Sequence, residues 1–184
     1  MKKVLLLGDS IRLNYMPAVF RQMSDRAVIY GPEENCRFSK YTLWGLDGWL
    51  GQETYDVIHF NCGIWDATRT GGWDNETFST EEEYRRCMEM VIRRLLRTGS
   101  KLIIATSTPS SGKDPCHRNG DIIRFNGILC ELAERYSIPV NDLWSLVASD
   151  PERYICEDGL HLSREGIKAA AQAVTDAVDR RLSE

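Results

Sequence analysis

The chain begins with a short run of large aliphatic residues, 4–7, that stops at Gly8-Asp9-Ser10. Such a run is too short for a helix, and an uninterrupted aliphatic segment bounded by glycine is typical of a strand buried on both faces in a parallel sheet. Ligands of open α/β sheets bind in the crevice outside the carboxyl ends of the strands. Ser10 follows the strand directly, so it falls where a functional side chain would lie. A simple turn with a helix cap is the alternative interpretation.

Strand-like and helix-like segments alternate along the rest of the chain. This alternation predicts a three-layer α/β/α sandwich with a central five-stranded parallel sheet. We expect the other strands at residues 27–30, 55–62, 101–106 and 138–141, and helices at residues 17–24, 42–50, 80–97, 119–136, 142–149 and 163–182. No repeat, low-complexity segment or linker interrupts the pattern, which predicts one domain over residues 1–184.

Composition and charge exclude several classes of function. The net charge of −4 gives no basic surface for nucleic acid or anionic membranes, and no apolar stretch approaches the length of a membrane span. Residues 2–7 lack the long apolar region and cleavage site of a signal peptide, so a cytoplasmic location is expected. The six cysteines show no Cys-x-x-Cys spacing, which predicts reduced thiols, no metal site and no cofactor.

An acid and a histidine lie close together near the other end of the chain, at Asp158 and His161. A serine nucleophile requires a base within hydrogen-bond reach, and that base requires a group that orients it. One short segment before the last predicted helix therefore contains both partners that Ser10 would need. Other polar segments, at residues 61–66 and 107–118, also follow predicted strands and should lie at the same sheet edge.

Together, Gly8-Asp9-Ser10 and Asp158-Gly159-Leu160-His161 resemble the first and last motifs of the SGNH (GDSL-type) hydrolase superfamily. The resemblance covers nearly the whole chain and implies a flavodoxin-like SGNH hydrolase fold. It also implies a serine esterase in which Ser10 attacks an ester carbonyl, His161 transfers the proton and Asp158 orients His161. The implied partner is a small ester, such as an O-acetyl group on a carbohydrate, and the reaction requires no cofactor.

The groups that would bind the oxyanion depart from the family pattern. The resemblance implies the Ser10 amide, a glycine amide after the second strand and an asparagine side chain after the third. Here Gly63-Ile64-Trp65-Asp66 stands where the family has Gly-x-Asn-Asp, so Trp65 replaces the asparagine. The indole N–H of Trp65 and the side chain of Asn61 are both possible donors. For the glycine after the second strand, Asn35 lies at about the right place, and Gly31 and Gly45 fit less well.

Substrate contacts are expected from Asp9, Gly63, Trp65 and Trp73, since aromatic rings at this edge suit sugars or acyl groups, although core packing is equally compatible with them. Two other functions stay open. One is a catalytically idle relative that binds carbohydrate, and the other is a flavodoxin-like binding or signalling domain. A Rossmann nucleotide-binding domain is disfavoured because no Gly-x-Gly-x-x-Gly follows the first strand.

Overall fold

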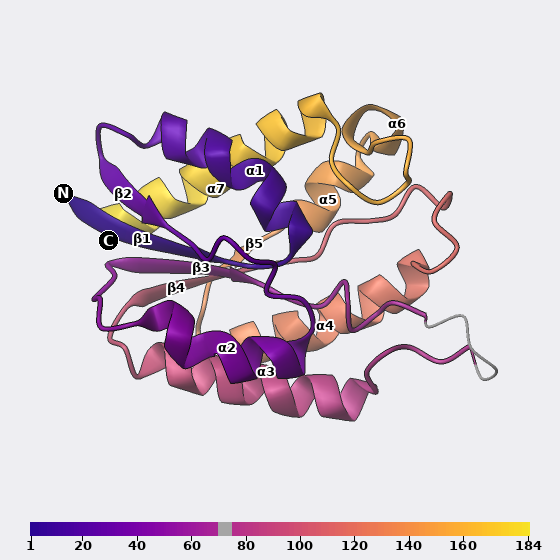
Figure 1. Ribbon diagram of the computed structural model, residues 1–184, viewed down its shortest axis with the longest axis horizontal. Helices are drawn as coiled ribbons and strands as arrows, with labels where there is room; N and C mark the ends of the chain where they lie inside the picture. Colours follow the sequence, from indigo (N-terminus) through magenta and orange to yellow (C-terminus); the bar gives the residue numbers. More distant parts are fainter. Residues whose placement is uncertain (70–74) are drawn as a thin grey trace.

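The computed structural model describes residues 1–69 and 75–184, and its centre is a sheet of five parallel strands (Figure 1). The strand order is β2-β1-β3-β4-β5, with β1 and β3 in the interior of the sheet. The strands are β1 (Lys2–Leu7), β2 (Ala27–Tyr30), β3 (Val57–Asn61), β4 (Lys101–Ala105) and β5 (Val140–Asn141). The predicted three-layer α/β/α architecture with a five-stranded parallel sheet is therefore confirmed.

Helices cover both faces of the sheet, and Figure 1 shows α1 and α7 on one side and α2, α3 and α4 on the other. The helices are α1 (Ser10–Gln22), α2 (Ser39–Leu50), α3 (Glu81–Leu96), α4 (Asn119–Arg135), α5 (Leu143–Ala148), α6 (Pro151–Tyr154) and α7 (Arg164–Ser183). The two short helices α5 and α6 connect β5 to α7.

The aliphatic run of β1 is continuous because side chains on both faces of this strand are buried. Leu5 and Leu7 belong to the core formed with α2, α3 and α4, whereas Val4 and Leu6 belong to the core formed with α1 and α7. Successive side chains of a strand point to opposite faces, so a strand covered by helices on both faces needs apolar residues at every position. The pairing of Leu7 with Phe60 on β3 places Gly8 and Asn61 at the same edge.

Helix α1 starts earlier than the sequence predicts. It begins at Ser10 rather than at residue 17, and the carboxylate of Asp9 caps it by accepting a hydrogen bond from the Ile11 amide. Pro17 lies inside the helix, where proline removes one backbone hydrogen bond. Burial of Ile11, Tyr15 and Val19 against the sheet outweighs this loss, so the helix continues through the proline.

Most other elements follow the expectations, with ends shifted by a few residues. A capping box of Thr80 and Glu83 opens α3 at the predicted start, and Ser163 caps α7. Cys62 lies just beyond β3 rather than within it. Helix α6 was absent from the sequence prediction, because a single turn opened by Asp150 and Pro151 is too short to show helical periodicity.

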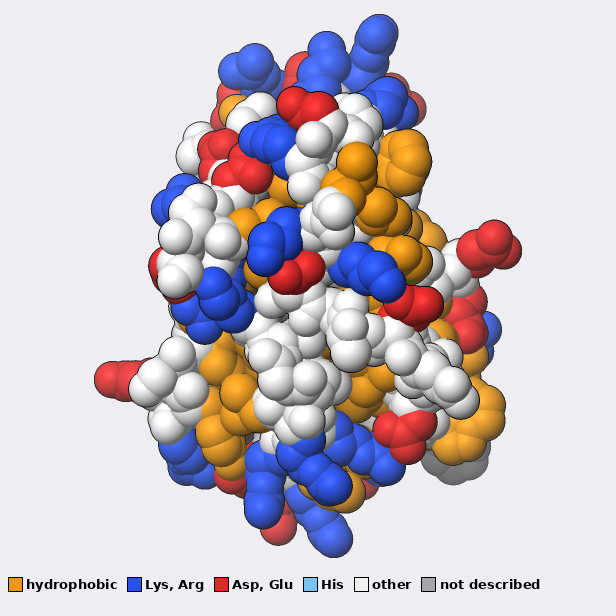
Figure 2. Space-filling model, turned by 90° about the vertical axis from the view of Figure 1, so that its left-hand side faces the viewer, with side chains coloured by type: hydrophobic (Ala, Val, Ile, Leu, Met, Phe, Trp, Pro, Cys, Tyr) orange, Lys and Arg blue, Asp and Glu red, His pale blue; other side chains and the backbone are white. Residues whose placement is uncertain are grey.

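Both termini lie at the amino ends of the strands, away from the edge that carries Ser10 (Figure 1). The face at that end shows lysine and arginine side chains interspersed with acidic ones (Figure 2). Across residues 1–69 and 75–184, no helix is long and apolar enough to cross a membrane.

The first turn of α7 packs against α6 with no room for a side chain at Gly166. A methyl group there would lie 2.1 Å from the carbonyl oxygen of Tyr154. Gly127 is the useful contrast, since it is exposed within α4 and a methyl group there would meet nothing within 4 Å.

We expect Gly166→Ala to lower the free energy of unfolding by about 1–3 kcal/mol, because the added methyl group would force α7 away from α6. The matched variant Gly127→Ala should raise it by about 0.5–1 kcal/mol, because alanine is a better helix former than glycine. Urea unfolding of both variants beside the wild type measures these changes. Equal or greater stability of Gly166→Ala would contradict the close packing.

Candidate active site

Ser10 sits at the carboxyl end of β1, where the chain turns into α1. Its hydroxyl lies 3.0 Å from Nε2 of His161, a residue that comes 151 positions later in the chain. This hydrogen bond joins the turn after β1 to the segment that precedes α7. The two motifs at opposite ends of the sequence are therefore in hydrogen-bond contact.

Asp158 orients His161 through a compact local turn. One carboxylate oxygen accepts hydrogen bonds from the amides of Leu160 and His161, at 2.9 and 3.0 Å. The other lies 2.8 Å from Nδ1 of His161. The Leu160 amide is the main cause that lowers the pKa of Asp158, followed by its bond to His161. An ionised Asp158 accepts from Nδ1–H, which leaves the Nε2 lone pair facing the Ser10 hydroxyl.

The loop after β4 supports the turn that carries Asp158. The carbonyl oxygen of Gly159 accepts hydrogen bonds from the Ser110 hydroxyl and the Ser111 amide, at 3.0 and 2.9 Å. Gly159 has a φ of +84°, and a Cβ there would lie 2.9 Å from both Lys113 and the Asp114 amide. Glycine is thus required for conformation and for space, which explains the Asp-Gly sequence in the motif.

Arg12 fastens the loop after β2 to the turn that carries Ser10. Its side chain is fully buried in α1, and its guanidinium donates to the carbonyl oxygens of Pro32, Glu34 and Gly8, at 2.7, 2.7 and 3.3 Å. The Cys36 amide adds a bond to the Gly8 carbonyl at 3.1 Å. Sequence analysis missed Arg12. The only available signal was a charged residue between the apolar positions of an amphipathic helix.

Asp9 lies in the interior beside Ser10. Its side chain is 1% exposed, one oxygen caps α1, and the other has no hydrogen-bond partner within the described part of the chain. Burial raises the pKa of Asp9 to about 6, although the Ile11 amide and the nearby Arg12 charge oppose this shift. The predicted contact of Asp9 with substrate is therefore not available to its carboxylate, which acts inside the fold.

The candidate oxyanion donors occupy different surroundings. Asn61 is buried at the end of β3, where its amide nitrogen donates to the Ala105 carbonyl at 3.2 Å. Its Cβ lies 3.5 Å from the position that a Cβ on Gly8 would take. Asn35 accepts from the Arg37 amide at 2.7 Å. Trp65 is 39% exposed, and its indole N–H has no hydrogen bond to any residue described. Asn61 is thus beside the nucleophile turn.

Gly63 and Trp73 are the remaining residues that were predicted to contact substrate. Gly63 is buried with a φ of +146°, and a Cβ there would meet the Tyr84 hydroxyl at 3.0 Å. The space beside Gly63 is therefore filled by protein. Trp73 lies outside the described residues.

Asp66 joins three segments beside the site. Its buried carboxylate accepts from the Ser39 amide and hydroxyl, at 2.9 and 2.5 Å, and from the Ser79 hydroxyl at 2.6 Å. These bonds connect the start of α2 and the segment before α3 to the loop after β3. Burial raises the pKa of Asp66, and the bonds from Ser39 and Ser79 counteract it.

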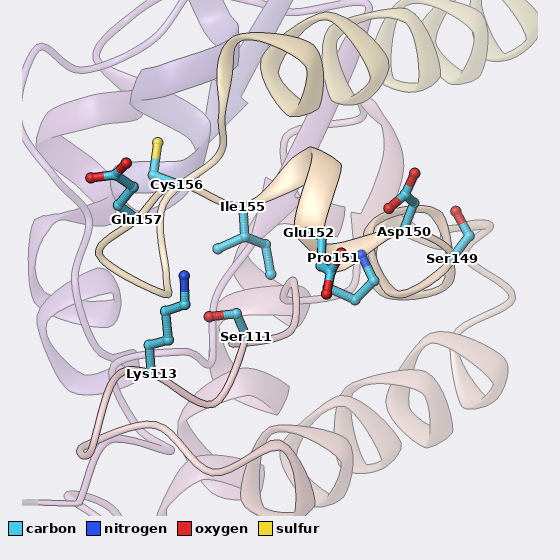
Figure 3. A pocket seen from close by; sticks show the side chains of 9 residues that line it. All are labelled: Ser111, Lys113, Ser149, Asp150, Pro151, Glu152, Ile155, Cys156 and Glu157. Carbon is cyan, nitrogen blue, oxygen red and sulfur yellow. The ribbon is translucent and has the colours of Figure 1, made fainter.

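A cavity of about 720 Å³ lies between the loop after β4 and the segment formed by α6 and residues 155–157 (Figure 3). Lys113 points toward the segment of Cys156 and Glu157, and Asp150 lies at the other end (Figure 3). Neither Ser10 nor His161 lines this cavity, so it is separate from the hydrogen-bonded triad. In the described ranges, no group of three or more His, Cys, Asp or Glu side chains could hold a metal ion.

The buried carboxyl of Asp9 makes stability depend on pH. The folded protein retains the Asp9 proton up to about pH 6, whereas the unfolded chain releases it near pH 4, so this group stabilises the fold at low pH and loses that effect as the pH rises through 6. Asp9→Asn still accepts from the Ile11 amide but does not ionise. The free energy of unfolding of Asp9→Asn relative to wild type should therefore rise by about 2 kcal/mol from about pH 4 to about pH 8. Urea titrations at both pH values measure this difference, and a constant difference would contradict the burial of the charge.

Comparison with protein-family models and with curated protein sequences finds no match. Solved structures are similar over almost the entire chain. A lipase/acylhydrolase from Enterococcus faecalis has a TM-score of 0.85 and 21% identity, with 98% of this chain and 97% of that chain covered. The acetyl xylan esterase AlAXEase has a TM-score of 0.82 and 20% identity, with 96% and 99% covered.

A GDSL-like lipase from Bacteroides thetaiotaomicron has a TM-score of 0.73 and 16% identity, with 97% of this chain and 88% of that chain covered. The likeness therefore extends over whole chains at low sequence identity. The sheet order and the helices on both of its faces agree with this comparison. The chain has the α/β fold of the SGNH (GDSL-type) hydrolases.

Proposed function

We propose that the protein is a serine esterase that hydrolyses small esters through an acyl-enzyme intermediate. The observation that carries the proposal is the continuous chain of hydrogen bonds from Ser10 to His161 to Asp158, at 3.0 and 2.8 Å. It lies at the carboxyl edge of a parallel sheet, where open α/β folds bind ligands. Solved structures with this fold include proteins named as a lipase/acylhydrolase and an acetyl xylan esterase.

In the first half of the reaction, the Ser10 hydroxyl attacks the ester carbonyl while Nε2 of His161 takes its proton. Asp158 holds the imidazole in orientation and stabilises its charged form. His161 then gives the proton to the departing alcohol, which leaves the acyl group on Ser10. In the second half, His161 deprotonates a water molecule that attacks the acyl-enzyme, and the acid is released as Ser10 recovers its proton.

The negative charge of the tetrahedral intermediate requires donors that are already in position. The Ser10 amide is one. We assign Asn61 as a second, because it lies beside Gly8 and is fixed by its bond to the Ala105 carbonyl. An amide group carries two N–H donors, so one remains after that bond. Asn35 and the exposed Trp65 are the other candidates for this role.

The proposed substrate class is a small ester, with O-acetyl groups on carbohydrate as the first choice. Support comes from the acetyl xylan esterase among the similar structures. The reaction needs no metal or cofactor, because serine, histidine and aspartate supply the nucleophile and the proton transfer.

Removing any member of the hydrogen-bonded chain should lower turnover sharply. With p-nitrophenyl acetate, we expect Ser10→Ala and His161→Ala to lower kcat by about 10⁶-fold, and Asp158→Asn by about 10⁴-fold. Ser24→Ala is the matched control, since this serine lies just after α1 and bonds only to the Arg21 carbonyl. If all variants and the wild type share one background rate, the esterase proposal fails.

The assignment of the second oxyanion donor has its own test. Asn61→Ala should lower kcat by about 10²–10³-fold with little change in KM, because the donor acts mainly on the transition state. Trp65→Phe keeps an aromatic side chain that lacks the N–H donor, so kcat should stay at the wild-type value. Thermal unfolding checks the fold of Asn61→Ala, since the Ala105 carbonyl loses a partner. A loss confined to Trp65→Phe would transfer the role to Trp65.

A further inference from the structure

A row of five aromatic side chains lies along α2 and next to its start. The rings of Phe78 and Phe38 have centroids 4.8 Å apart, and those of Phe38 and Tyr41 are 5.9 Å apart. Tyr41 in turn contacts Trp44 at 5.5 Å and Trp49 at 6.0 Å. We call these five residues the aromatic row. Trp44 is 77% exposed and Phe78 is 49% exposed, so the row presents ring surface to solvent.

The aromatic row is held in place by specific interactions. The Glu34 carboxylate accepts from the Tyr41 hydroxyl at 2.6 Å and from the Trp49 indole N–H at 2.9 Å. The Arg37 guanidinium lies 4.7 Å from the centre of the Tyr41 ring. Helix α2 also has glycine at position 45, where a Cβ would lie 2.6 Å from the Trp49 ring. A glycine within a helix lowers helix stability by about 1 kcal/mol relative to alanine. Here the missing side chain leaves room for the Trp49 ring.

The row begins at the edge of the sheet that carries Ser10. Arg12 and the Cys36 amide fasten the loop before Phe38 to the turn of Gly8. Asp66 fastens Ser39, the first residue of α2, to Ser79, which follows Phe78. The same network therefore fixes both the nucleophile turn and the near end of the aromatic row. From there the row extends along α2.

We propose that the aromatic row is a binding surface for the sugar chain of a polymeric carbohydrate ester, with the acetylated unit at Ser10. This inference rests on the proposed esterase function and assigns it a polymeric substrate. Sugar rings have flat faces of C–H groups and a rim of hydroxyls, so they stack on exposed aromatic rings and hydrogen-bond to polar groups between them. Glu34 supplies such a group at the edges of the Tyr41 and Trp49 rings, and the Arg37 guanidinium, which lies over the Tyr41 ring, supplies N–H donors beside them.

The Glu34 carboxylate favours a carbohydrate over a protein partner. Cores of protein interfaces are enriched in aromatic residues and arginine but depleted of glutamate, whereas Glu34 lies among the rings of this row and bonds to two of them. The aromatic row begins at the sheet edge that carries Ser10, which also favours a carbohydrate. An ester group on a polysaccharide must reach Ser10 while the rest of the sugar chain extends away from it.

The test compares Trp44→Ala with Phe20→Ala, which removes an exposed aromatic ring from α1, outside the row. Binding is measured by affinity electrophoresis in gels containing xylan or glucomannan, in a Ser10→Ala background so that no ester is cleaved. Activity is measured on p-nitrophenyl acetate, acetylated xylobiose and acetylated xylohexaose. Light scattering reports the oligomeric state of each variant.

We expect Trp44→Ala to weaken retardation by at least one polysaccharide and to raise KM for acetylated xylohexaose by about 5-fold, as loss of one stacked ring implies. Activity on p-nitrophenyl acetate should be unchanged, and Phe20→Ala should match the wild type throughout. The proposal is overturned if neither polysaccharide retards the protein, if Trp44→Ala has no effect, or if Trp44→Ala only converts a dimer to a monomer.

The two proposals fail in different ways. Cleavage of p-nitrophenyl acetate that depends on Ser10, with no polysaccharide binding, leaves the esterase and removes the sugar-chain surface. Polysaccharide binding that depends on Trp44, with no ester cleaved by any variant, retains the surface and removes the esterase.

Discussion

The guanidinium of Arg12 is enclosed by the protein, and the geometry of the site depends on it. Removing a cation from water is expensive unless good acceptors replace the solvent. Here the replacements are the carbonyl oxygens of Gly8, Pro32 and Glu34, so one side chain of α1 binds both the turn after β1 and the loop after β2. Without Arg12 the carbonyl oxygens of Pro32 and Glu34 would lose this donor, and the loop before α2 would be held to the nucleophile turn by the Cys36 amide without the support of the guanidinium.

Asp66 complements Arg12 on the other side of the same loop. The buried guanidinium of Arg12 donates hydrogen bonds to carbonyl oxygens, and the buried carboxylate of Asp66 accepts hydrogen bonds from Ser39 and Ser79. Together they connect the turn after β1, the loop after β2, the start of α2, the loop after β3 and the segment before α3. The loops at this edge are therefore fixed by buried polar contacts, whereas the helices and strands are fixed by apolar packing.

The fold could be predicted because its signals are local. Residues 4–7 are apolar at every position, as a doubly covered strand requires, and Thr80 with Glu83 marks a helix start by side-chain chemistry alone. Helix α1 begins at Ser10 rather than at residue 17, because burial of Ile11, Tyr15 and Val19 stabilises the helix on both sides of Pro17.

The site was predictable only in part, because only some of its residues belong to local motifs. Ser10, Asp158 and His161 come from short motifs that are visible in the chain, and the structure brings them into hydrogen-bond contact. Arg12 and the aromatic row could not be found in this way, because their partners come from separate segments that meet only in the folded protein. The position of Asn61 beside Gly8 likewise depends on the pairing of β1 with β3.

The turn that joins Asp158 to His161 spans three residues, whereas the contact from His161 to Ser10 spans 151. The acid and the base therefore form a unit within one local segment, and the third member reaches it only when α7 docks on α1. Contacts between residues so distant in the chain are slow to form because long loops must close first. The site is therefore complete only when the two ends of the chain are together, and we expect the Ser10 contact to form after the local turn of Asp158 and His161.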